Sequence, residues 1–325
     1  MTWRSKLSLL ALAWAGSPAL AFEAQAVPFY ESYPIQELQG AGGVKIAYKI
    51  IPLAGSARAV VIAQGFSETM VKYAELAWEL RRAGYSVILY DHRGQGHSGR
   101  LNADPHKGYL DDFANLVADL KTVTETAARP LAHDLFLIAH SMGGGVGALY
   151  LAQHPDDFRK AILSAPMLAM PLPKWQRTPV LWLMGLCKLL HLDEFYVRGP
   201  SDPAKFTFAT NLVTSDPERY EELQVKPARA QPQDQVWGIT ARWLYEAMTG
   251  IARARELAGK VQTPVVLLQA GDDRFVGGDG QDDFCAQATR CKILPLPGAR
   301  HEIFSEQDRY RAPALAATLK FFAEP

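Results

Sequence analysis

The chain is 325 residues long and carries 34 basic and 34 acidic side chains, so its formal net charge at pH 7 is zero. This balance excludes the strong positive field that binding of nucleic acid or a polyanion requires, and it favours a small-molecule or lipid substrate. The length exceeds that of most single domains but suits an α/β fold that carries an insertion.

The first residues have the pattern of a secretory signal peptide. A basic segment precedes an apolar run over residues 7–14, which is too short to cross a bilayer, and small residues stand at Ala19 and Ala21. We therefore predict that residues 1–21 are removed by cleavage after Ala21 and that the mature protein is periplasmic or secreted. The alternative interpretations are an uncleaved membrane anchor or a disordered tail.

Strand and helix signals alternate along most of the chain. Segments 33–38 and 44–51 flank a glycine-rich turn and predict an opening antiparallel pair of strands. The later strand segments are apolar throughout, which indicates strands buried on both faces of a parallel sheet. These segments are 59–63, 86–90, 135–139, 161–164, 265–269 and 292–294. The predicted fold class is α/β, with a mostly parallel, doubly wound sheet.

The stretch 167–260 interrupts this alternation. It is rich in Pro, Trp and Met at its start, has a helical pattern over 237–257 and contains no clear strand. We therefore predict a helical cap inserted into a core formed by residues 22–166 and 261–325. The apolar segment 180–190 has three interpretations: it lines an acyl-chain channel, it rests on a membrane surface, or it packs the cap against the core.

The sharpest chemical signal is the strand 135–139, which runs into His140, Ser141 and a helix of small residues. This pattern is typical of a nucleophile elbow, where the serine adopts strained backbone angles and the residues two positions away must be small. Ala139 and Gly143 meet that requirement, so Ser141 is the predicted nucleophile. His140 is expected to point away from it.

A serine nucleophile needs a base, and the base needs an acid that holds its tautomer. The loop after the 265–269 strand contains Asp272 and Asp273, and we prefer Asp273 as the acid. His301 lies downstream in a loop before the C-terminal helix, where the base belongs in the order serine, acid, histidine. The predicted catalytic residues are therefore Ser141, Asp273 and His301.

A tetrahedral intermediate also requires N–H donors for its oxyanion. The backbone N–H of Met142 is one predicted donor, and that of Phe66, in the loop after an early core strand, is the second. Ser67 and Glu68 in the same loop are expected to cap the helix that follows. The glycine-rich loop 91–99 lacks the lysine of a phosphate loop and is interpreted as structural.

The three cysteines predict no metal site, since no Cys and His residues have metal-ligand spacing, and no cofactor motif is present. In an oxidising compartment Cys285 and Cys291 could pair, and the sequence leaves that pairing open. Cys187 lies in an apolar stretch and is expected to be a buried free thiol.

Most of the mature chain resembles the monoacylglycerol lipase and bacterial lysophospholipase branch of the α/β-hydrolases. The similar stretches are 64–100, the elbow, 267–275 and 298–304, with a weaker likeness over 211–220. The resemblance implies an α/β-hydrolase fold with an inserted cap, the predicted triad, and cleavage of carboxylic esters of single-chain lipids through an acyl-enzyme.

Two positions depart from the family pattern, since Ala139 replaces a glycine of the elbow and Gln64 stands where many relatives have histidine. Neither change removes a reacting group. The expected partner is a small lipid or ester, with membrane contact through the cap as a further hypothesis. The alternatives are a short-chain carboxylesterase and a catalytically silent α/β-hydrolase that binds a ligand.

Overall fold

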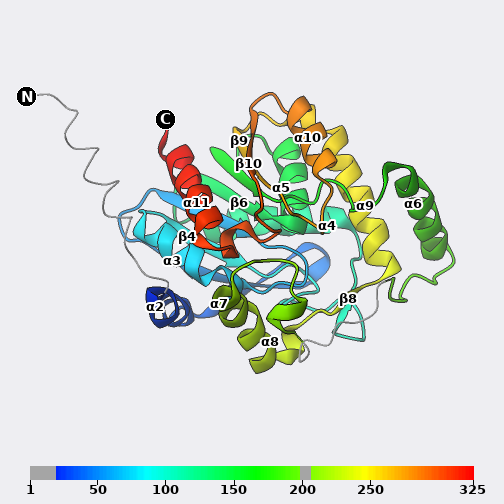
Figure 1. Cartoon of the computed structure of the whole chain (residues 1–325), viewed down its shortest axis with the longest axis horizontal. Helices are drawn as coiled ribbons and strands as arrows, with labels where there is room; N and C mark the ends of the chain where they lie inside the picture. Colours follow the sequence, from blue (N-terminus) through cyan, green and yellow to red (C-terminus); the bar gives the residue numbers. More distant parts are fainter. Residues whose placement is uncertain (1–19, 198–205) are drawn as a thin grey trace, which may run out of the picture.

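The structure is a computed structural model that describes residues 20–197 and 206–325 (Figure 1). The predicted signal peptide lies outside the described residues except for its last two positions, which begin helix α2 (Leu20–Glu31). Among the residues that the structure describes, none of the helices combines the length and the apolar character that spanning a bilayer requires.

The central sheet has eight strands, which in chain order are β1 (Ile35–Gln39), β2 (Lys45–Ile51), β3 (Arg58–Ala63), β4 (Ser86–Tyr90), β6 (Asp134–His140), β7 (Lys160–Ser164), β9 (Val265–Ala270) and β10 (Cys291–Leu296). Their spatial order is β1-β2-β4-β3-β6-β7-β9-β10. β2 pairs antiparallel with β1 and with β4, and the other neighbours are parallel. The mostly parallel sheet and its antiparallel opening pair are therefore confirmed.

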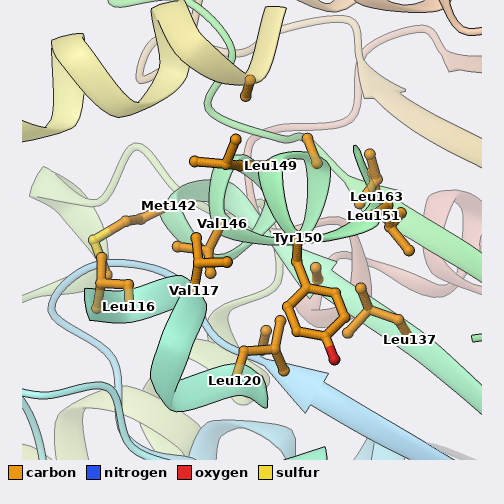
Figure 2. Close-up of a cluster of buried hydrophobic side chains, with 14 of the residues drawn as sticks. Leu116, Val117, Leu120, Leu137, Met142, Val146, Leu149, Tyr150, Leu151 and Leu163 are labelled. Carbon is orange, nitrogen blue, oxygen red and sulfur yellow. The ribbon is translucent and has the colours of Figure 1, made fainter. Parts of the chain in front are cut away.

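Helices cover both faces of this sheet. Besides α2, they are α3 (Ala74–Arg82), α4 (Phe113–Val123), α5 (Ser141–Gln153), α10 (Gly278–Gln287) and α11 (Asp308–Ala323). The 3₁₀ turn η3 (Met70–Tyr73) precedes α3, and the π-helical turn η4 (Thr124–Ala128) extends α4. Two further short 3₁₀ turns are η2 (Ala41–Gly43) and η10 (Ile303–Ser305). Successive strand residues point to opposite faces. Val61 and Leu137 pack in the cluster that contains α4, α5 and α10, whereas Val60 and Phe136 pack with α2, α3 and α11. Figure 2 shows α4 and α5 meeting through Leu116, Val117, Val146 and Tyr150.

The predicted cap region contains helices α6 (Lys174–Leu189), α7 (Pro217–Tyr220), α8 (Lys226–Ala230) and α9 (Ala241–Glu256), with shorter turns η6 (Phe208–Thr210), η7 (Glu221–Val225), η8 (Pro232–Asp234) and η9 (Ala258–Lys260). It also contains β8 (Gly238–Ile239), which pairs in parallel with β5 (Lys107–Gly108) of the core. β8 does not join the central sheet, and a two-residue strand is too short to leave an alternation pattern in the sequence.

The α7 end of the cap is attached to the core by a network of charges that are largely buried except for Asp308. We call this network the polar anchor, and its members are Arg219, Glu75, Asp308, Arg311 and Glu79. Arg219 of α7 donates to both Glu75 carboxylate oxygens of α3 at 2.8 and 2.9 Å and to Asp308 of α11 at 2.8 Å. Arg311 of α11 binds Glu79 of α3. α7 therefore shares one ion network with two core helices.

The other end of the cap is helix α6, which we call the apolar arm. It packs against α9, and Figure 1 shows it projecting at the edge of the molecule. Within it, Met184 is buried, whereas Trp175, Trp182 and Leu189 are 75%, 76% and 74% exposed. Packing of the cap against the core therefore does not account for these side chains.

Cys285 of α10 and Cys291 at the start of β10 form a disulfide, with their Cα atoms 5.1 Å apart. Cys187 is a free thiol, as expected, but it is half-buried and not buried. The expectation of burial is wrong because α6, in which Cys187 lies, leaves much of its apolar surface uncovered.

Candidate active site

Ser141 occupies the sharp turn between β6 and α5. Its φ angle is +52°, in the left-handed region that a residue with a side chain rarely adopts. Such an outlier persists only when its surroundings hold it, and it is frequent at catalytic residues. Its carbonyl oxygen accepts the N–H of Met167 at 2.8 Å, which links the turn to the segment after β7.

Two glycines of α5 allow this turn to form. A Cβ atom on Gly143 would lie 2.3 Å from the carbonyl oxygen of Gln64, so the first turn of α5 lies directly against the backbone that leads to Phe66. A Cβ atom on Gly147 would lie 2.9 Å from the Cβ of Ala139. The alanine that replaces the usual elbow glycine is therefore accommodated because Gly147 has no side chain.

The structure brings the three predicted triad residues together. His301 Nε2 lies 2.8 Å from Ser141 Oγ, and His301 Nδ1 lies 2.7 Å from Asp273 Oδ2. The His301 side chain is 6% exposed and that of Asp273 is 8% exposed. This geometry places a hydrogen-bonded base on the serine hydroxyl and a carboxylate behind the base, as nucleophile activation requires.

Asp273 is held as an acceptor from two sides. Its Oδ1 accepts the N–H groups of Phe275 at 2.8 Å and Val276 at 3.2 Å. Burial raises the pKa of the Asp273 carboxyl, but the hydrogen bond from His301 and these two N–H groups outweigh burial, so the pKa is below its ordinary value. The side chain of Asp272, the alternative acid, is half exposed and lies 3.9 Å from Arg274.

His140 lies close to the base, a contact that the sequence did not predict. Its ring centroid is 4.8 Å from that of His301, and its Nδ1 lies 3.0 Å from the carbonyl oxygen of Ser164. Burial is the main cause that lowers the pKa of His140 to about 3. At neutral pH His140 is therefore uncharged, and its ring packs beside the His301 imidazole.

The two predicted oxyanion donors lie on neighbouring segments. Met142 is the second residue of α5, and the first N–H groups of a helix have no carbonyl partner within it. Among the described residues, the N–H of Phe66 has no backbone acceptor. The Phe66 ring packs against Trp243 of α9, with centroids 4.5 Å apart, so the oxyanion loop also contacts the cap.

The prediction that Ser67 and Glu68 cap the following helix is wrong. Thr69 is the residue before η3 and its side chain does not cap that turn; the N–H of Met70 instead donates to Asp91 Oδ1 at 2.9 Å. The Glu68 carboxylate instead accepts the N–H of Gly65 at 2.6 Å and forms an ion pair with Lys72. The opposite charges of Glu68 and Lys72, four residues apart, were the available signal, although Glu68 lies in the loop before η3 and not on a helix.

The side chain of Gln64 supports the oxyanion loop. Gln64 is the residue that replaces the histidine expected from the family resemblance. Its Nε2 donates to Asp91 Oδ1 at 3.0 Å and to the carbonyl oxygen of Glu68 at 3.1 Å. Burial lowers the pKa of His92 to about 4, so its neutral ring can donate from Nε2 to the Gln64 carbonyl oxygen 3.0 Å away. The loop 91–99 thus has the structural role inferred for it.

A cavity of about 580 Å³ lies between α2 and α8, with Tyr30, Lys49 and Asp234 in its lining. Neither Ser141 nor His301 lines it, so it is separate from the triad. Within residues 20–197 and 206–325, no three His, Cys, Asp or Glu side chains gather as a metal ion would need.

Comparison with known proteins gives both a family and relatives. A family model described as serine aminopeptidase, S33 matches residues 55–308. A probable lysophospholipase L2 from Haemophilus influenzae is 30% identical over 301 residues, which cover 92% of this chain and 95% of that protein. Lysophospholipase L2 from Escherichia coli K12 is 34% identical over 276 residues, which cover 82% and 80% of the two chains. These relatives confirm the resemblance to the lysophospholipase branch.

A solved structure shares the fold. A soluble variant of monoglyceride lipase from Saccharomyces cerevisiae, in complex with a substrate analog, superimposes with a TM-score of 0.69 at 21% identity. The match covers 89% of this chain and 94% of that one. At this identity the likeness concerns the fold, and the predicted α/β-hydrolase fold is confirmed.

Proposed function

The chain belongs to the serine aminopeptidase S33 family, and from this membership and the site geometry we propose that it hydrolyses carboxylic esters of single-chain lipids, with Ser141 as nucleophile. The observation that carries the proposal is the continuous hydrogen-bonded chain from Ser141 through His301 to Asp273. The N–H groups of Met142 and Phe66 complete the site as oxyanion donors.

The geometry supports a two-step reaction. His301 Nε2 accepts the Ser141 hydroxyl proton as Oγ attacks the ester carbonyl carbon, and the imidazolium that forms is held by Asp273. The imidazolium then gives the proton to the leaving alcohol as the C–O bond breaks, which leaves an acyl-enzyme on Ser141. His301 next deprotonates a water molecule that attacks this ester, releasing the fatty acid and restoring the serine.

Lysophospholipid is the substrate class that we favour, with monoacylglycerol as the alternative lipid. The two relatives at 30% and 34% identity are named lysophospholipases, and their matches extend over most of this chain. A long acyl chain also suits a protein that exposes the apolar arm, because a lipid substrate is presented at the surface of a micelle or membrane.

The apolar arm supports a further proposal, that the cap contacts the lipid surface on which the substrate lies. Trp182 and Leu189 are each about three-quarters exposed, and the side chain of Lys174 at the start of the helix is 72% exposed. Exposed Trp and Leu on one side of a helix with a basic residue at its end are typical of interfacial helices. We propose contact, without insertion across the bilayer.

We also propose that the mature chain starts after Ala21 and is periplasmic or secreted. The basic, apolar and small-residue pattern of residues 1–21 supports this localisation. The Cys285–Cys291 disulfide is also consistent with it, because disulfides persist in oxidising compartments.

The deciding experiment measures fatty-acid release from lysophosphatidylcholine, monoacylglycerol and p-nitrophenyl butyrate by the wild type and by Ser141→Ala. We expect hydrolysis of the long-chain lysolipid to fall at least about 1,000-fold in the variant, because the nucleophile is lost while oxyanion and binding contributions remain. Full activity of Ser141→Ala would show that the nucleophile is assigned wrongly.

The same assay separates the alternatives. Preference for the short ester would make the protein a carboxylesterase. An amino-acyl p-nitroanilide tests the peptidase activity that the family description names, and we expect it to remain uncleaved. Failure of a fluorophosphonate probe to label Ser141, with no substrate cleaved, would support a catalytically silent protein.

A further inference from the structure

Lys72 is buried between two carboxylates that come from two different loops. Its ammonium group forms ion pairs with Glu68, in the loop after β3, and with Glu302, in the loop after β10. The three side chains are 6% to 7% exposed. We refer to Glu68, Lys72 and Glu302 as the buried triplet.

One end of the buried triplet is bonded to the oxyanion loop. Glu68 Oε2 accepts the N–H of Gly65 at 2.6 Å, immediately before Phe66, whose N–H is a proposed oxyanion donor. The same oxygen accepts the Tyr73 hydroxyl at 2.6 Å. Because Glu68 is held from two sides, it limits how far the Gly65–Phe66 backbone can move.

The other end of the buried triplet is bonded to the histidine loop and to the cap. Glu302 follows His301 directly in the chain, and its own N–H donates to the carbonyl oxygen of Val213 at 2.9 Å. Gln224 of η7 donates to the Glu302 carboxylate. A shift of Glu302 would therefore displace His301 relative to the serine.

The charges of the triplet are interdependent, because one ammonium group serves two buried carboxylates. Burial raises the pKa of Glu68, but Lys72, together with His140 and Tyr73, outweighs burial and the pKa of Glu68 is lowered. At Glu302 burial prevails, and its pKa is raised. Loss of Lys72 would leave both carboxylates without a counter-ion, and uncompensated buried charge is strongly unfavourable.

We propose that Lys72 is a positioning residue for the reaction: through Glu68 and Glu302 it fixes the oxyanion loop and the His301 loop at the separation that the tetrahedral intermediate requires. The proposal rests on the proposed function of Ser141. It predicts that removal of Lys72 slows the chemical step more than it weakens substrate binding, because a small misplacement of reacting groups lowers the rate steeply.

The test compares Lys72→Met, Lys72→Arg, Glu302→Ala and Glu302→Gln on p-nitrophenyl butyrate, with the active sites counted by fluorophosphonate titration. We expect kcat per active site to fall about 100-fold in Lys72→Met and about 10-fold in Glu302→Ala, with KM within about threefold of the wild type. Lys72→Arg and Glu302→Gln keep a hydrogen bond between the two loops and should retain most of the activity.

Lys49→Met is the matched control, since Lys49 is also buried but lines the cavity apart from the triad. We expect its kcat to match that of the wild type even if its stability falls. The proposal is overturned if folded Glu302→Ala and Lys72→Met both keep kcat within twofold of the wild type. If Lys72→Met does not fold, Glu302→Ala decides alone. Ser141→Ala, run in parallel, separates a failure of the triplet from a failure of the proposed nucleophile.

Discussion

The two ends of the cap are attached to the molecule by different forces. At the α7 end, the polar anchor places Arg219 in contact with carboxylates of α3 and α11, and its guanidinium is largely buried. At the other end, the apolar arm packs against α9 and leaves large apolar side chains in contact with solvent. The first end is specified by paired charges that tolerate little movement, and the second presents an apolar surface that no described part of the chain covers.

This difference indicates that the two ends of the cap have different roles. Buried ion pairs need accurate geometry, so the polar anchor keeps η7, with Gln224, next to the histidine loop. An exposed apolar helix is costly for a soluble protein unless it meets another apolar surface. The anchored end of the cap thus lies beside the histidine loop, and the exposed end is the surface that we propose for contact with lipid.

The largest effect should come from breaking the polar anchor. Arg219→Met removes the closer of the two arginine partners of buried Glu75 and leaves Arg311 at 3.4 Å, so we expect the free energy of unfolding to fall by about 3 kcal/mol, as measured by urea denaturation. Arg253→Met is the control, because the Arg253 side chain is 51% exposed and its ion pair with Glu256 should be worth less than about 1 kcal/mol. Equal losses in the two variants would contradict the anchoring role.

The apolar arm should respond in the opposite way. Trp182→Ser combined with Leu189→Ser should change the free energy of unfolding by less than about 0.5 kcal/mol, because both side chains are exposed. Binding to phosphatidylcholine vesicles should weaken at least about tenfold, since burial of such side chains contributes about 1.5–3 kcal/mol each. Hydrolysis of a soluble short ester should be unchanged.

Leu212→Ser provides the comparison for that pair, because Leu212 is 41% exposed but lies outside the apolar arm. Its vesicle binding should equal that of the wild type. If Leu212→Ser loses as much vesicle binding as the double variant does, the apolar arm is not the contact surface. This conclusion holds whatever ester hydrolysis the double variant retains.

The smallest effect concerns pH. His97 lies 3.3 Å from Asp91 of the core and 3.3 Å from Asp234 of the cap, and the hydrogen bond to Asp91 is the main cause that raises its pKa. A raised pKa means that the fold favours the imidazolium. The stabilisation is therefore complete below pH 6.5 and is lost as the pH rises through the raised pKa.

The measurement is urea denaturation of the wild type and His97→Gln between pH 6 and pH 9. The wild type should be the more stable protein at pH 6, and the difference should shrink as the pH rises. If the difference in the free energy of unfolding between the two proteins stays constant across this range, the charge on His97 does not stabilise its contacts with the core and the cap.

Local patterns made the core and the triad predictable. The parallel strands of the central sheet are short, mostly apolar runs, and Ser141, Asp273 and His301 each follow one of them, so their positions could be derived from neighbouring residues. The polar anchor could not be derived in this way, since Arg219 and Glu75 are 144 positions apart and each alone resembles a solvated surface charge. Glu68 was interpreted as a cap because Glu302, the second carboxylate that Lys72 binds, is far away in the chain and the buried triplet is not visible without it.

The contact between Ala139 and Gly147 constrains how this sequence could have arisen. The methyl group at position 139 occupies space that any side chain at position 147 would also need. With glycine at position 139, a Cβ atom at position 147 would lose this contact and would keep only those with the side chains of Leu137 and Leu163, at 3.2 and 3.5 Å. Alanine at position 139 therefore requires glycine at position 147, and we expect the two positions to vary together among related sequences.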